Sequence, residues 1–280
     1  MRRGTSRHGG RPHGTRRHEG GGSARWRTTS TNLLTGGATI DGTELFARYA
    51  YAPNRLGYCG PRDAEALHGG SAAQIRALAR EFSGAWPYLR VMAKLTGITD
   101  PLDHRLVESY WLGGGIGADL DPTTFTTELL ALIEPMAGHY WSHLTADLSD
   151  EAAANHGFHV FAIYPWSRLL DRGTGEHPLR ILDSCRITPA TVVTTGLTVR
   201  SRRLIRDGPL LALSEPELRQ VAFDDARLAA ALHPGDHVAL HWDHVCARLT
   251  PDRLIDLTTS TDRQLAVTNR RLSRQLNHVE

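Results

Sequence analysis

The chain has 280 residues, of which 40% are hydrophobic and 22% charged, and its formal net charge is +2. These values are typical of a globular protein with one or two domains, and the absence of any run of about 18 apolar residues argues against a membrane span. Neither a secretory nor a twin-arginine leader is recognisable, so we expect a cytoplasmic protein. The cysteines are three in number and widely spaced, which argues against a disulfide framework and an all-thiolate zinc cage: Cys59, Cys185 and Cys246.

The positive charge is concentrated at the N-terminus. Residues 1–27 contain eight Arg and one Glu, a balance of +7, so the other 253 residues carry −5 to reach the total of +2. This segment has almost no aliphatic side chains and cannot offset the entropy of ordering, so we expect residues 1–38 to form a disordered tail rich in Arg, Gly and His. Its histidines are irregularly spaced and its arginines lack interleaved aromatic residues. We therefore expect a solvated extension without a nucleic-acid partner.

The segment from about 40 to 148 has helical periodicity. Thr43 is placed to cap a first helix through Ala50, which Pro53 and the turn at 57–61 would end. Further helices are predicted over 71–82, 86–95, 101–111, 122–133 and 135–148. The apolar run at 158–166 predicts either a buried strand or a helix, because periodicity does not distinguish the two.

The pattern changes after residues 171–178, which contain two Gly and one Pro and mark the best domain boundary. Short strands are then predicted over 179–185, 190–195, 197–205, 209–213, 218–223, 236–242 and 244–248. So many short strands favour a compact antiparallel barrel, since closure removes the edges of a sheet. Thr250 and Pro251 begin a long amphipathic helix. The predicted fold is therefore α+β, with a helical domain over 39–175, a small barrel over 178–249 and a C-terminal helix over 250–280.

Two motifs in the second half share a characteristic order and separation. The first is a cysteine followed by a proline four residues later and a valine seven residues later: Cys185, Pro189 and Val192. The second is a Gly-Asp-aromatic-Val pattern, then a histidine and an aliphatic residue before a helix: Gly235, Asp236, His237, Val238, His241 and Leu249. Together they resemble the HypC/HupF family of small [NiFe]-hydrogenase maturation chaperones, over residues 180–270 at most.

This resemblance implies an accessory protein that does not catalyse a turnover reaction. Family members carry an iron–cyanide–carbonyl fragment on their cysteine and dock on a maturation scaffold protein and on the precursor of the hydrogenase large subunit. It implies that Cys185 and His241 form the metal site for transient iron, with no permanently bound cofactor, and that Pro189, Gly235 and Asp236 shape the backbone. A thiolate is a soft ligand suited to such iron, and an imidazole can lower the pKa of the thiol or add a ligand.

The sequence also departs from that family. Its cysteine lies inside the chain instead of at the N-terminus, and Trp242, Asp243 and His244 replace a smaller segment that contains glycine. The helical domain has no counterpart there. Its motifs resemble an uncharacterised bacterial family of unknown function, which names no activity: 49–54, 56–61, 159–161 and 164–166.

The helical domain contains a competing set of ligands. His139 and His143 are four residues apart and would share a helix face, while His156 and His159 follow a short loop later. They would make a metal-dependent enzyme, such as a hydrolase or oxygenase with an open site, although the glutamate of a zincin motif is missing. A structural interpretation stays open too, in which Cys185 is a small buried residue and His241 bonds locally in an interaction protein.

Overall fold

The computed structural model describes residues 40–62, 64–134, 144–170, 176–194, 198–223 and 225–276. Residues 39–280 form one compact unit, to which all the described residues belong. The predicted tail, residues 1–38, lies outside the described residues, as do His139 and His143. No helix in the described part of the chain is long and apolar enough to cross a membrane.

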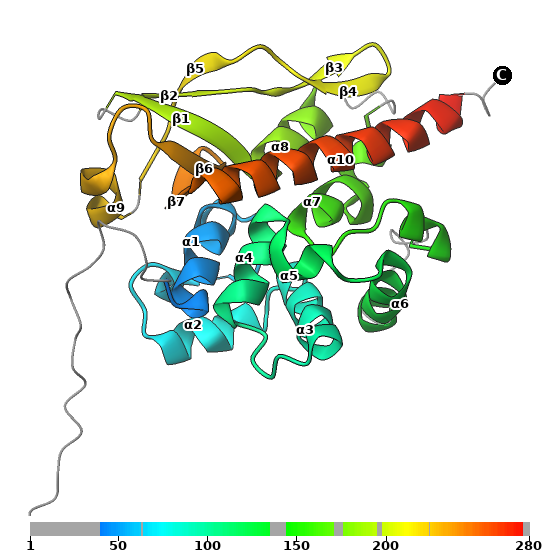
Figure 1. Cartoon of the computed structure of the whole chain (residues 1–280), viewed down its shortest axis with the longest axis horizontal. Helices are drawn as coiled ribbons and strands as arrows, with labels where there is room; N and C mark the ends of the chain where they lie inside the picture. The colour runs from blue at the N-terminus through cyan, green and yellow to red at the C-terminus, as the bar shows by residue number, and fades with distance from the viewer. Residues whose placement is uncertain are drawn as a thin grey trace, which may run out of the picture. The chain divides into compact units, whose positions relative to one another are not determined.

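The N-terminal part is helical, as predicted (Figure 1). Asp41 caps the first helix by accepting a hydrogen bond from the Thr43 backbone N–H at 2.8 Å, so the cap is Asp41 and not Thr43. Pro53 lies inside this helix and does not end it. The elements are α1 (Gly42–Arg55), η1 (Glu65–Leu67), α2 (Ala72–Ala79), α3 (Ala85–Thr96), α4 (His104–Leu112), α5 (Gly115–Ala118) and α6 (Pro122–Ile133).

The apolar run after residue 155 is helical, which decides between the two predicted alternatives. Asn155 caps it through its side-chain oxygen, 3.0 Å from the Phe158 backbone nitrogen. The helix then widens into a π-helical turn, in which the Tyr164 N–H donates to the His159 carbonyl at 2.8 Å. Such turns are rare and often occur at functional sites. The elements are η4 (Ala146–Asp150), α7 (His156–Phe158), η5 (His159–Ile163) and η6 (Pro165–Arg168).

The C-terminal part contains a five-stranded antiparallel sheet in the order β5-β2-β1-β6-β7 and a separate β3–β4 hairpin. The predicted closed barrel is wrong: in the described part of the chain the sheet is open, and a single isolated bridge joins Ala222 to His244. The predicted strand 197–205 breaks at residues 202–203, so the hairpin leaves the sheet and packs on α8 and α10. The strands are β1 (Thr188–Thr194), β2 (Thr198–Ser201), β3 (Leu204–Asp207), β4 (Leu210–Leu213), β5 (Glu217–Gln220), β6 (His237–His241) and β7 (His244–Arg248), with α9 (Ala226–Ala231) before β6.

The strand predicted over 179–185 is also wrong, because this segment forms helix α8 (His177–Cys185). Pro178 occupies the first turn, where its missing N–H costs nothing, and the buried Pro178, Ile181 and Leu182 follow helical spacing. Cys185 is therefore the last residue of a helix, three positions before β1.

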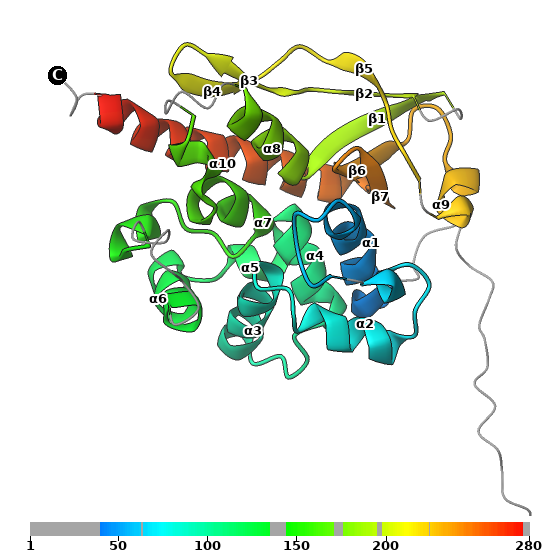
Figure 2. The same ribbon diagram turned by 180° about the vertical axis from the view of Figure 1, so that it is seen from behind.

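The final helix, α10 (Pro251–Leu276), contacts both the helical part and the strands. In Figures 1 and 2 it runs beside α8 and the sheet on one side and beside α4 and α7 on the other. One hydrophobic cluster includes most buried residues of α1, α3 and α4 together with Ala239, Cys246 and Leu249 from the second half. Because the helices and the strands β6 and β7 share this cluster, side chains from the two halves of the chain meet inside one fold.

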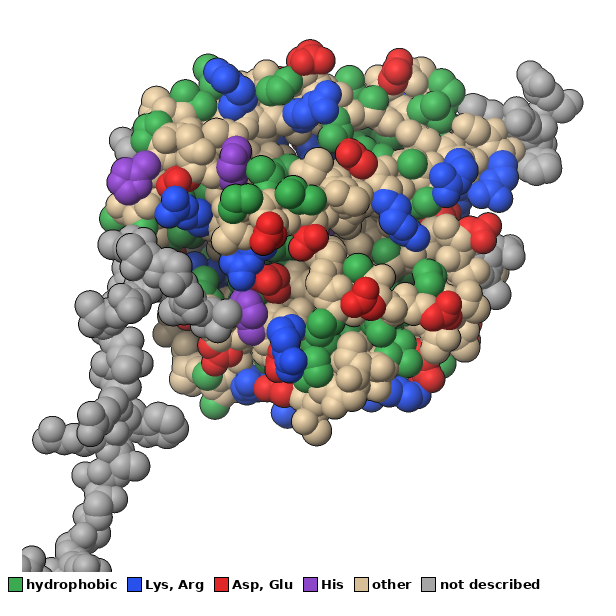
Figure 3. All heavy atoms as spheres, in the orientation of Figure 1, with side chains coloured by type: hydrophobic (Ala, Val, Ile, Leu, Met, Phe, Trp, Pro, Cys, Tyr) green, Lys and Arg blue, Asp and Glu red, His purple; other side chains and the backbone are tan. Residues whose placement is uncertain are grey.

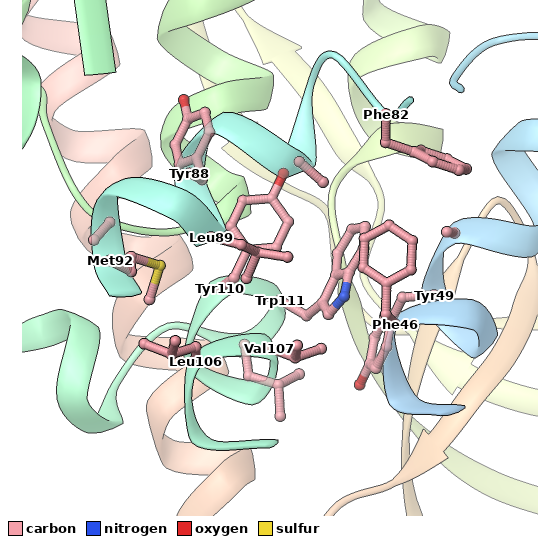
Figure 4. Close-up of a cluster of buried hydrophobic side chains, with 14 of the residues drawn as sticks. Phe46, Tyr49, Phe82, Tyr88, Leu89, Met92, Leu106, Val107, Tyr110 and Trp111 are labelled. Carbon is pink, nitrogen blue, oxygen red and sulfur yellow. The ribbon is translucent and has the colours of Figure 1, made fainter. Parts of the chain in front are cut away.

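Aromatic side chains dominate the centre of that cluster (Figure 4). Trp111 stacks on Tyr49 with ring centroids 5.2 Å apart and meets Phe46 at 6.1 Å. On the outer face shown in Figure 3, acidic and basic side chains of the described residues are interspersed. The aromatic cluster forms one wall of the site described next.

Candidate functional site

A cavity of about 70 Å³ lies where α1, α4, the π-helical turn, the end of α8 and the β6–β7 turn meet. Two thiols and three imidazoles line it: Cys59, Cys185, His156, His159 and His241. Half of the remaining lining residues are aromatic: Tyr58, Tyr110, Trp111, Tyr164, Trp166 and Trp242. One water molecule needs about 10–15 Å³, measured as the space open to the centre of a water-sized sphere. By the same measure this cavity has room for a small ligand.

Cys185 is positioned through its backbone. The carbonyls in the last turn of a helix lack intrahelical partners. The Nε2–H of His156 donates to the Cys185 carbonyl at 2.9 Å, and the Tyr110 hydroxyl lies 3.1 Å from Nδ1 of the same ring. Because a carbonyl only accepts, Nε2 carries the proton and Nδ1 accepts from Tyr110. Both nitrogens of His156 thus have partners: Nε2 holds the end of α8, and the bond from Tyr110 to Nδ1 orients the ring.

His241 has a different arrangement. Its Nδ1–H donates to the Tyr49 backbone carbonyl at 2.7 Å, which leaves Nε2 with a lone pair in the neutral ring. The ring packs edge-to-face on His156 at 5.2 Å. Burial lowers the pKa of His241, and the backbone carbonyls of Tyr49 and Cys185 oppose this effect. A histidine whose second ring nitrogen donates to a backbone carbonyl is oriented as metal-ligating histidines are.

His159 is buried, and its Nδ1 has no hydrogen-bond partner among the described residues. Its other side lies against Gly84, where an added Cβ would be 2.9 Å from Nε2. Only glycine at position 84 leaves room for this ring. An unpaired buried polar atom costs about 1–3 kcal/mol, which makes Nδ1 a candidate contact for a ligand.

Burial keeps the site uncharged at neutral pH. It lowers the pKa of His241 to about 4, that of His159 to about 3 and that of His156 well below its usual value. It raises the pKa of Cys59 to about 11 and that of Cys185 to about 12. Free thiols and neutral imidazoles therefore line the cavity, and a thiolate would form there only if a metal replaced the proton.

The rim of the cavity contains strained backbone. Trp242 and Asp243 both have positive φ, 52° and 59°, in the two-residue turn between β6 and β7. Such a turn requires positive φ at both positions and normally uses glycine or asparagine, so each residue costs of order 1–3 kcal/mol. The Trp242 N–H donates to the Ser184 carbonyl at 3.0 Å, and Asp243 pairs with Arg219.

This turn holds Trp242 against Tyr58, with the rings stacked 4.0 Å apart. Tyr58 is 42% exposed, so the stacked pair forms the part of the wall that reaches the surface. Backbone strain of this kind concentrates at functional sites, which favours a role for this rim beyond packing.

The structure thus places Cys185 and His241 along one cavity, together with His156 and His159 from the competing set. His139 and His143 lie outside the described residues. The described part of the chain contains no group of three or more His, Cys, Asp or Glu side chains arranged to hold a metal ion. The buried carboxylate of Glu151 is paired with Arg271 at 2.7 Å.

Pro189 lies in β1, and Gly235 and Asp236 precede β6; none of the three lines the cavity. Pro189 pairs with Ala239, and Gly235 has a φ of 94° in the turn before β6. Asp236 accepts a hydrogen bond from the His233 backbone at 2.9 Å and pairs with Arg248 at 2.6 Å. These contacts shape the turn and strand that lead to His241.

The sequence patterns assigned no functional role to Cys59. Cys59 lies in the turn after α1, where the Asn54 amide donates to the carbonyls of both Cys59 and Pro61 at 2.8 Å. Gly60 has a φ of 83°, and an added Cβ there would lie 2.4 Å from the ring of Phe82. The one available signal was a cysteine within a rigid Gly/Pro turn, because such turns often carry functional side chains.

Comparison with known families assigns the chain to a family without assigning an activity. The model of a family of unknown function, DUF6390, matches residues 38–275. The chain belongs to this family. No curated protein and no solved structure matches it. Membership confirms the resemblance of the N-terminal part to an uncharacterised family and covers the C-terminal part as well, whereas the comparisons show no similarity to HypC/HupF.

Proposed function

We propose that this DUF6390 protein is an accessory factor for maturation of a [NiFe] hydrogenase, and that it carries an iron–cyanide–carbonyl fragment on Cys185. The observation that supports this best is the shared cavity. Cys185 and His241, which belong to two separate sequence motifs, line the same small space although different elements supply them. The resemblance of those motifs to HypC/HupF supplies the identity of the cargo.

The donor set suits a cargo that brings its own ligands. A metal ion that protein side chains alone coordinate usually needs three or four of them, and no such group exists among the described residues. An iron already bound by cyanide and carbonyl needs only one or two more, and a thiolate is the soft ligand it favours. Cys185 would supply sulfur and the Nε2 of His241 nitrogen or a close contact, while Tyr49 orients the ring.

The surroundings favour carriage over chemistry on a substrate. Burial shifts every cavity histidine toward its neutral form, so none is poised near neutral pH for proton transfer. The largely apolar wall would limit the access of water, which would protect a reactive fragment during transfer. Delivery to the large-subunit precursor, and loading from a maturation scaffold protein, would occur past Tyr58 and Trp242.

Substitution of Cys185 tests the proposal. In a host whose hydrogenase depends on this protein, Cys185→Ala is expected to abolish hydrogenase maturation because the fragment loses its sulfur ligand. Hydrogenase activity in cell extracts measures the effect. Cys246→Ala is the matched control, since Cys246 is buried but does not line the cavity. Full hydrogenase activity in a strain with folded Cys185→Ala protein would refute the proposed function.

A further inference from the structure

Cys59 and Cys185 belong to distant parts of the chain, yet they line the same cavity. Their electrostatic coupling agrees with this proximity: Cys59 raises the pKa of Cys185 after the larger effect of burial, and both cysteines raise the pKa of Tyr164. Cys246, the third cysteine, lies instead in β7 within the hydrophobic cluster. Two of the three thiols are therefore directed to one small space.

Hydrogen bonds hold the backbone at both cysteines. The Asn54 side-chain amide donates to the Cys59 carbonyl. Gly60, which packs on Phe82, fixes the turn that follows. The His156 imidazole fixes the Cys185 carbonyl, and the Trp242 N–H fixes the preceding carbonyl of Ser184. Positions held in this way before binding lose little entropy when a ligand arrives, which is what a binding site requires.

A third donor lies on the same cavity. His159 is 6% exposed, and its Nδ1 has no partner within the described residues. This unpaired atom is independent of the two cysteines and favours a ligand, since a buried ring nitrogen without a partner leaves its desolvation uncompensated.

We propose that Cys59 and Cys185 form a two-sulfur site for a thiophilic metal centre, with His159 beside it. The inference deepens the proposed function, on which it rests for the identity of the cargo, by adding Cys59 as a second sulfur ligand. When a divalent ion binds, two S–H bonds break, two metal–sulfur bonds form and two protons pass to solvent, while water molecules complete the coordination of the ion. Thiolates select soft metals, so oxygen-preferring ions such as Mg²⁺ would not occupy this site.

Cadmium(II) is a suitable probe, because sulfur-to-cadmium charge-transfer absorption in the ultraviolet grows with the number of bound thiolates. Titration of the full-length reduced protein is expected to give one equivalent of bound cadmium with a two-sulfur band. Cys59→Ser and Cys185→Ser should each halve the band and weaken binding by at least about tenfold, because loss of even an outer-shell contact costs 10–100-fold. Cys246→Ser, the matched control, should bind as the wild type does.

Cadmium affinity and band intensity equal to those of the wild type in Cys59→Ser would overturn the two-sulfur site. A loss of affinity and band intensity in Cys246→Ser as large as that in Cys59→Ser would overturn it too. Far-ultraviolet circular dichroism of each variant identifies any that fails to fold. Cys59→Ala would then replace a misfolded Cys59→Ser. The outcome is separable from that of the proposed function: maturation that needs Cys185 but not Cys59, with single-sulfur cadmium binding, would sink this inference and leave the carrier proposal standing.

Discussion

Acidification below pH 6.5 is expected to destabilise the metal-free protein steeply, by about 1.4 kcal/mol per pH unit for each buried cavity histidine. The residues responsible are His156, His159 and His241, whose pKa values burial lowers in the folded state. Because three groups act together, the combined slope reaches about 4 kcal/mol per pH unit, comparable to a large part of the stability of a typical domain.

The direction follows from proton binding. Below pH 6.5 the unfolded chain protonates these histidines, while the folded chain does not, so the unfolded state binds more protons and gains stability as the pH falls. The contribution of the three neutral histidines to the free energy of unfolding is fully present above pH 6.5. It is lost progressively for His241 down to about pH 4 and for His159 down to about pH 3.

Urea denaturation at intervals between pH 7.5 and 4.5 measures this dependence. His241→Gln should remove about a third of the slope, whereas His233→Gln, at a histidine on the surface, should leave it unchanged. A free energy of unfolding that stays constant across this range would contradict the burial of neutral histidines in the cavity.

Asp183→Ala is expected to cost about 3–5 kcal/mol of stability, because it leaves a buried charge without its partner. The Asp183 carboxylate accepts a hydrogen bond from Arg186 Nε at 3.0 Å and one from the Leu204 backbone N–H at 2.7 Å, and it forms an ion pair with Arg186 Nη2 at 2.9 Å. The Arg186 side chain is only 3% exposed, so solvent cannot replace the carboxylate. These contacts fix the last turn of α8, which presents Cys185.

Thermal or urea denaturation of Asp183→Ala checks the expected loss. Glu217→Ala is a good control, because Glu217 pairs with Arg203 in the same network but is 49% exposed, so its loss should cost less than about 1 kcal/mol. If both variants lost less than about 1 kcal/mol of stability, the Asp183–Arg186 pair would not be holding the end of α8.

Local patterns in the sequence predicted the helices well. Asp121 followed by Pro122, and the helical spacing of the apolar residues, correctly located α6, and Thr250 with Pro251 located the start of α10. The α+β class followed from the change to short strands, which was predicted after residues 171–178 and which begins in the structure with β1 at Thr188. These features depend on contacts within a few residues, which a sequence displays directly.

The predictions were wrong where contacts between distant parts of the chain determine the secondary structure or the pairing of strands. The 179–185 segment is apolar enough for a strand, but its burial follows helical spacing. The closed barrel failed because the chain leaves the sheet at residues 202–203, and the new partners of the β3–β4 hairpin, α8 and α10, lie elsewhere in the sequence. No local signal fixes such pairing.

The site was only partly predictable for the same reason. Motif spacing singled out Cys185 and His241, and the structure places both on one cavity, while their role in metal binding remains a prediction. Spacing gave no reason to connect Cys59 or His159 to them, because their proximity depends on how α1 and the π-helical turn pack against the end of α8.

Infrared spectroscopy tests the central claim most directly, because cyanide and carbonyl ligands of iron absorb where proteins do not. Protein purified without oxygen from cells that are maturing hydrogenase should show these bands. The bands should persist in Cys246→Ala and disappear in Cys185→Ala. Bands of wild-type intensity in Cys185→Ala, or none in the wild-type protein from such cells, would contradict carriage of the iron fragment on Cys185.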